Sequence, residues 1–206
     1  MLAWMLIFEL AAGAAEVEYA PAVSPTPAAF PAVLGDIACR LPFDTDAKDA
    51  DLVTYAHEGN HFLCRGKAGF HGLYIGNGIR VFVPTPPLLT AEVFAAIPAE
   101  DRGSIYETYR QQGATEYWSI QPLMLLDEWC AYTSGSITRG ELKLGNRQES
   151  DRYCAEMATY VWHLWRMSQA LPHYDSRDLT EFCRWNEERC KLRIPGWRTM
   201  FTREFR

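Results

Sequence analysis

The chain has 206 residues, of which 48% are apolar and 22% charged, a composition that suits one globular domain with a real core and excludes a disordered chain. Its formal charge of −6 disfavours a protein that coats nucleic acid or binds membranes through a basic surface, because both need clustered Lys and Arg. We therefore expect no nucleic-acid partner. No apolar run reaches the ~18 residues of a membrane-spanning helix, so we also expect no membrane span.

The N-terminal region differs in composition from the rest of the chain. Residues 1–15 pass from an apolar stretch into Ala-Ala-Gly-Ala-Ala, which is typical of a secretory signal, although no Lys or Arg precedes the apolar stretch. Residues 16–33 hold four prolines, which block helices and sheet ladders and so indicate an extended tail or linker. We therefore expect a signal-like segment, a tail and a domain over residues 34–206. Export to the periplasm, cell envelope or exterior follows, with a cytoplasmic location as the alternative.

The six cysteines bear on the same question. They are spread along the chain and contain no CxxC pair. In an exported protein they allow up to three disulfides, and in a cytoplasmic one they are buried thiols.

Two elements in the first half of the domain are predicted by their boundaries. Three aspartates crowd the start of an apolar stretch and glycines follow it, which predicts a helix over residues 46–64. Residues 72–83 then form two β-rich arms around Asn77-Gly78, the dipeptide most typical of a tight hairpin turn.

The second half of the chain has the spacing and boundary residues of helices. We predict them over residues 91–97, 98–112, 122–133, 146–170 and 176–194. Pro122 is expected in the first turn of the third of these, and Gly135 at its end. The predicted fold is mainly α (α+β): a helical domain with a small β-hairpin after the first long helix.

That first helix contains His57-Glu58-Gly59-Asn60-His61, a complete HExxH sequence. Histidines four residues apart lie on one face of a helix, so both imidazoles can reach one metal ion. Glu58, about 100° away around the helix, can reach a water on that metal. These are the ligand types of a catalytic zinc site. Gly59 weakens a helix, and we expect a substrate or strand to approach closely there. The alternative is two ordinary core or surface histidines.

A third ligand has to come from another part of the chain. Glu128 is one candidate, because it lies on a separate predicted helix, with Ala131 three residues later. Three other residues stay open as alternatives: His71, Cys64 and Glu116.

Through His57, Glu58, His61 and Glu128, the chain resembles HExxH zinc metallopeptidases of the gluzincin type, in which a Glu on a second helix completes the site. In that type a small residue often follows the Glu by one turn and lets the helices approach closely, as Ala131 would here, so the resemblance favours Glu128 as the third ligand. The resemblance covers about residues 50–135. It implies one Zn²⁺ per chain, held by the two histidines and Glu128, and a peptide or protein substrate. The chain departs from the gluzincin pattern upstream, where those enzymes have a sheet with a substrate-binding edge strand, because here the hairpin follows the motif.

The resemblance implies a zinc-dependent peptidase that hydrolyses peptide bonds through a metal-activated water, with Glu58 as the general base. Asp127 or Asn60 would orient a ligand histidine. A donor to the developing oxyanion would come from one of three residues: Tyr132, Tyr117 or His71. The alternative function is a non-catalytic helical domain that binds zinc or a protein partner.

Overall fold

Helices make up most of the computed structural model, which describes residues 18–20, 32–41, 49–67, 69–145, 148–199 and 201. Segment 1–15 and most of the tail lie outside these residues. The helices are α1 (Val33–Ala38), α2 (Asp49–Leu63), α3 (Thr90–Ala96), α4 (Tyr106–Gly113), α5 (Glu116–Ser119), α6 (Met124–Glu141), α7 (Gln148–Gln169) and α8 (Arg177–Arg193), with a 3₁₀ turn, η2 (Ala99–Asp101). The strands are β1 (Glu18–Ala20), β2 (Arg65–Lys67), β3 (Phe70–Gly76) and β4 (Ile79–Pro84). The predicted mainly α fold is confirmed.

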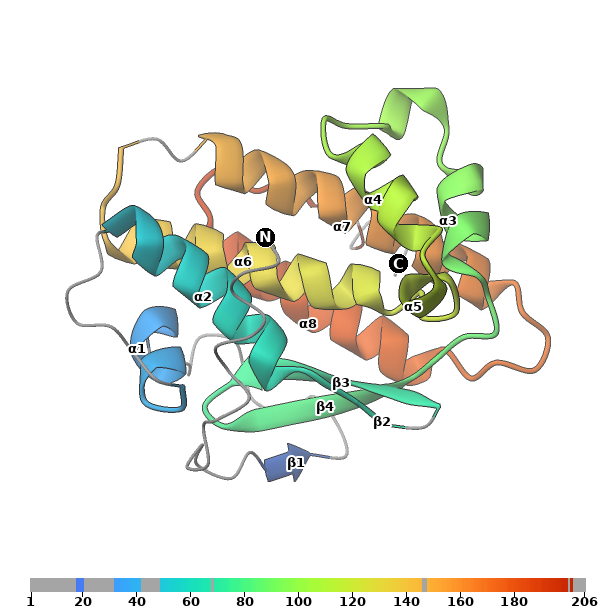
Figure 1. Cartoon of the computed structure of the whole chain (residues 1–206), viewed down its shortest axis with the longest axis horizontal. Helices are drawn as coiled ribbons and strands as arrows, with labels where there is room; N and C mark the ends of the chain where they lie inside the picture. The colour runs from blue at the N-terminus through green and yellow to red at the C-terminus, as the bar shows by residue number, and fades with distance from the viewer. Residues whose placement is uncertain are drawn as a thin grey trace.

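Helix α6 forms the centre of the domain (Figure 1). It packs against α2 on one side and α7 on the other, and it also contacts α1, α8 and β3. Thirteen of its 18 residues are buried, as expected for a helix surrounded by other elements. Trp129 is among them and stacks on Phe201 at 5.5 Å, so it belongs to the core.

The predicted end of this helix at Gly135 is wrong, because α6 continues to Glu141. Gly135 lies where α2 crosses α6. A Cβ atom at this position would lie 3.6 Å from the carbonyl oxygen of Val53 and 3.7 Å from the Cβ of His57. The glycine therefore marks a close helix–helix approach inside the helix, and it is not a terminator.

The sheet is larger than the predicted hairpin. Its strand order is β1-β4-β3-β2, with β3 antiparallel to both its neighbours and β1 parallel to β4. The hairpin itself is confirmed: Asn77 and Gly78 have φ of 53° and 75°, the positive values that a type I′ turn needs. The three-residue strands at the two edges were not predicted, since segments this short take their conformation from their partners. One of them, Glu18–Ala20, belongs to the tail.

The helix predicted over residues 98–112 is interrupted. The chain forms η2, leaves helical structure after it and begins again with α4. Glu156 of α7 explains the interruption, because its carboxylate accepts hydrogen bonds from the Ser104 hydroxyl and from the Ile105 backbone N–H, both 3.0 Å long. A side chain from a distant helix thus satisfies the backbone N–H of the residue that precedes α4.

Helix α2 is held at both its middle and its end. Gly59 packs against Ile37 of α1 so closely that a Cβ atom would lie 2.6 Å from the Cγ2 of Ile37. The close neighbour of Gly59 is therefore helix α1, whereas the sequence led us to expect a substrate or a strand. At the C-terminal end, the buried guanidinium of Arg80 on β4 donates to the Leu63 carbonyl.

Helix α1 is also fixed to the hairpin turn, through a buried carboxylate. Asp36 accepts hydrogen bonds from the Tyr74 hydroxyl at 2.6 Å and from the Asn77 backbone N–H at 2.9 Å. Arg40 pairs with the same carboxylate at 3.3 Å. Through α1, the sheet and the HExxH helix are therefore joined into one unit.

Within the part of the chain that the structure describes, no helix combines the length and apolar character needed to cross a membrane. All six cysteines are free thiols, and five of them are buried. None of the disulfides that an exported protein would allow is therefore present.

Candidate metal centre

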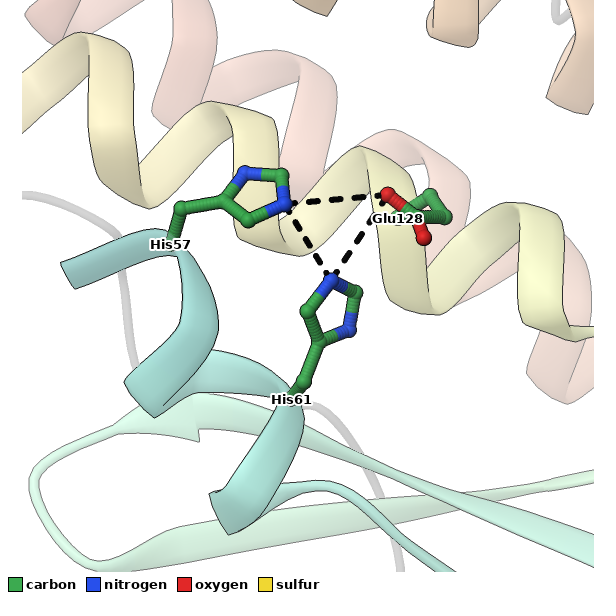
Figure 2. Close-up of side chains that lie close together, drawn as sticks. All are labelled: His57, His61 and Glu128. Atoms are coloured by element: carbon green, nitrogen blue, oxygen red, sulfur yellow. Dashed lines mark hydrogen bonds and ion pairs between the residues drawn. The ribbon is translucent and has the colours of Figure 1, made fainter. Parts of the chain in front are cut away.

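Two helices bring the three predicted ligands together (Figure 2). His57 and His61 project from one face of α2 toward α6, where Glu128 faces them. The Nε2 atoms of His57 and His61 are 3.3 Å apart. The Oε2 of Glu128 lies 3.8 Å from the Nε2 of His57 and 3.6 Å from the Nε2 of His61. Among the described residues, these three form the group that could hold a metal ion.

The spacing of these atoms fits a first-row metal ion. From the three distances, the nearest point equidistant from the atoms lies in their plane, about 2.1 Å from each, and zinc bonds to His nitrogen and carboxylate oxygen are about 2.0–2.2 Å long. Two imidazoles and one carboxylate also match the protein ligands of many catalytic zinc sites. The side chains of His57 and His61 are 18% and 21% exposed, so both histidines are within reach of solvent.

A buried carboxylate orients one of the histidines. The Nδ1 of His61 lies 2.7 Å from Asp127 Oδ1, and the Nε2 of His71 lies 2.9 Å from Asp127 Oδ2. When His61 donates its Nδ1 proton to Asp127, its Nε2 lone pair is directed at the candidate metal position. Asp127 therefore occupies the predicted orienting position. His71 lies behind it and does not join the ligand cluster.

Glu128 has its own hydrogen-bond support. The Tyr109 hydroxyl of α4 donates to Glu128 Oε2 over 2.7 Å and lies 2.9 Å from the Tyr132 hydroxyl. The ring of Tyr132 also packs edge-on against His57, with their centroids 4.6 Å apart. Each of the three candidate ligands thus contacts a further side chain that restricts its position.

Burial and neighbouring charges set the protonation of the cluster. Burial, followed by the neighbouring His61, lowers the pKa of His57 to about 4, which leaves it neutral and able to bind metal near pH 7. Burial also acts to lower the pKa of His61, but the carboxylates of Asp127 and Glu128 outweigh it and hold that pKa well above its usual range. A metal ion entering the site would therefore displace a proton from His61.

Glu58 lies next to this cluster with an exposed side chain. Partial loss of hydration raises the pKa of its carboxyl, and the charge of Glu128 acts in the same direction, while His61 opposes both. An accessible carboxylate of raised basicity, on the same helix as two ligands, is suited to accept a proton from water.

The other candidate ligands lie outside the cluster. The Cys64 thiol is buried, donates to Asn60 Oδ1 and accepts from the Tyr74 backbone N–H, and burial raises its pKa well above the usual range, so it stays protonated. Glu116 is exposed at the start of α5, and its neighbour Tyr117 is 61% exposed.

Two residues of the site differ from expectation. The Asn60 amide donates to Ser134 on α6 at 3.0 Å, so Asn60 joins the two helices and does not orient a histidine. Tyr109 was not predicted, because it lies on a different helix from every motif and no local pattern marks it. Only the tertiary structure brings its hydroxyl, from α4, to Glu128 on α6.

Comparison with known proteins adds no identification. No protein-family model, curated protein or solved structure matches this chain. The interpretation of the site therefore rests on its residues and their geometry.

Proposed function

We propose that this protein is a zinc-dependent peptidase. The observation that carries the proposal is the convergence of His57, His61 and Glu128 at metal-ligand spacing, with the exposed carboxylate of Glu58 beside them. A second carboxylate in this position is what hydrolysis requires and what a purely structural metal site does not need.

Each residue of the site would have a separate role in peptide hydrolysis. His57, His61 and Glu128 would hold the ion, which when bound supplies a Lewis acid and makes water more acidic. Glu58 would accept the proton of the attacking water on its carboxylate and pass it to the nitrogen of the departing amine. Asp127 would keep the His61 ring oriented during this cycle.

The number of protein ligands favours a catalytic over a structural site. Structural zinc sites are closed by four protein ligands, whereas catalytic sites use three and leave a position for water or substrate. The group found among the described residues has three members, and two of them reach solvent.

Metal analysis combined with a hydrolysis assay tests the proposal. Metal content is measured by plasma mass spectrometry for the full chain and for His61→Ala, Glu128→Ala and Glu58→Gln, and hydrolysis by mass spectrometry of a diverse peptide library. We expect near-stoichiometric zinc that both ligand variants lose. Glu58→Gln should keep zinc but lose activity by about 10²–10⁴-fold. Glu107→Gln, an exposed glutamate of α4, is the matched control.

Other results of this experiment would favour a different function or refute the proposal. Zinc without hydrolysis would support the non-catalytic zinc-binding domain. Stoichiometric iron would indicate oxidative chemistry, because two His and one carboxylate also suit Fe(II). A wild-type protein that binds no metal after reconstitution would refute the proposal.

A further inference from the structure

Two tyrosine hydroxyls and the Glu128 carboxylate are linked in series by hydrogen bonds. Tyr109 comes from α4 and Tyr132 from α6, and their oxygens are 2.9 Å apart. The Tyr109 oxygen is also 2.7 Å from Glu128 Oε2, the same atom that faces both histidines. Tyr109 is buried, with 6% of its surface exposed, so water does not compete for these hydrogen bonds.

The number of available protons fixes the direction of the two hydrogen bonds that link Tyr132, Tyr109 and Glu128. A tyrosine hydroxyl has one proton to donate, and an ionised carboxylate can only accept. The Tyr109 hydroxyl donates to Glu128 Oε2 over 2.7 Å, and this hydrogen bond uses its single proton. The proton of Tyr109 therefore points to Glu128, and the contact between the tyrosines has to be filled by the proton of Tyr132.

We infer that Tyr109 is a positioning residue that fixes Oε2 of Glu128 as the metal-binding oxygen, with Tyr132 as the donor behind it. This inference rests on the proposed metal site. It also revises the expected role of Tyr132, because a hydroxyl proton already committed to Tyr109 is not free to stabilise an oxyanion.

The two supporting contacts act on the ligands in opposite directions. Asp127 accepts a hydrogen bond from the Nδ1–H of His61, which makes that imidazole a stronger electron donor to a metal. Tyr109 donates to the coordinating oxygen of Glu128, which draws electron density away from it and holds the carboxylate in one orientation. Tyr132 also packs on His57, so the tyrosine pair contacts two of the three ligands.

Conservative Tyr→Phe variants test this inference. Tyr109→Phe removes the donor to Glu128, and Tyr132→Phe removes only the donor behind it. Tyr106→Phe is the matched control, because Tyr106 lies on the same helix and its hydroxyl donates to the Phe94 carbonyl, away from the site. Zinc affinity is measured by chelator competition, and ligand geometry by the visible absorption spectrum of the cobalt-loaded protein.

We expect Tyr109→Phe to weaken zinc binding by about 10- to 100-fold and to change the cobalt spectrum. Tyr132→Phe should weaken zinc binding several-fold less than Tyr109→Phe does. Tyr106→Phe should match the wild type in both measurements. If Tyr109→Phe is unfolded without metal, the zinc concentration at which half of it folds gives the same comparison through linkage.

The results separate failure of this inference from failure of the proposed function. A wild type that binds zinc, with Tyr109→Phe equal to it in affinity and spectrum, overturns the inference and leaves the metal site standing. If Tyr109→Phe and Tyr132→Phe lose zinc affinity equally, the inferred order of donors, from Tyr132 to Tyr109 to Glu128, is wrong. A wild type that binds no metal removes the proposed function itself.

Discussion

Two glycines inside helices are expected to respond oppositely to the same substitution. Gly59 lies in α2 and Gly135 in α6, and each weakens its helix relative to alanine by about 1 kcal/mol. The space around them differs. A Cβ at Gly59 would lie 2.6 Å from the Cγ2 of Ile37, whereas at Gly135 the nearest atom would be 3.6 Å away.

The magnitudes follow from these distances. Carbon atoms in contact are normally about 3.5–4.0 Å apart, so Gly59→Ala requires the Ile37 methyl to move by roughly 1 Å. Ile37 is buried and branched at Cβ, so its methyl cannot rotate away easily. Overpacking costs about 1–3 kcal/mol, and a 2.6 Å approach to a buried methyl that cannot rotate away belongs in the upper part of that range, about 2–3 kcal/mol. After the gain in helix propensity, Gly59→Ala should lose about 1–2 kcal/mol, while Gly135→Ala should gain up to about 1 kcal/mol.

Urea and thermal unfolding in the presence of a chelator would measure both effects without a contribution from metal. For a chain of this size, we expect Gly135→Ala to raise Tm by about 2–4 °C and Gly59→Ala to lower it by about 2–8 °C. In an Ile37→Ala background, which lacks the obstructing methyl, Gly59→Ala should cost less. A Gly59→Ala protein as stable as the wild type would refute the packing argument, as would a Gly135→Ala protein that loses 1 kcal/mol or more.

Three further predictions concern the site and its support. Asp127→Asn should weaken zinc binding by about 10- to 100-fold in a chelator titration, because the amide cannot accept from two histidines as the carboxylate does. Zinc at a hundredfold excess over its Kd should stabilise the wild type by about 2.7 kcal/mol and leave His61→Ala unchanged in thermal unfolding. Asp36→Asn should cost about 1–3 kcal/mol in urea unfolding, since it weakens three hydrogen bonds to a buried residue, whereas the exposed Glu107→Gln should cost almost nothing.

Much of the site could be predicted because its chemistry is local. His57 and His61 share a helical face through spacing alone, and the structure directs both at one point. Glu128 was the favoured third ligand among four, and the structure places it, and none of the alternatives, beside the histidines. Its selection depends on α2 crossing α6 at Gly135, a contact that no local pattern specifies.

Local sequence was enough to predict the features that depend on neighbouring residues: the HExxH helix, the hairpin turn at Asn77-Gly78 and the mainly helical class. Three other features came from contacts between distant segments: Gly135 stays inside a helix, Gly59 is required by α1, and Tyr109 reaches Glu128. The difference lies in the range of the interactions. Periodicity and turn preferences act over a few residues, whereas a close approach or a buried hydrogen bond is made between segments far apart in the chain, and only the packed structure brings them together.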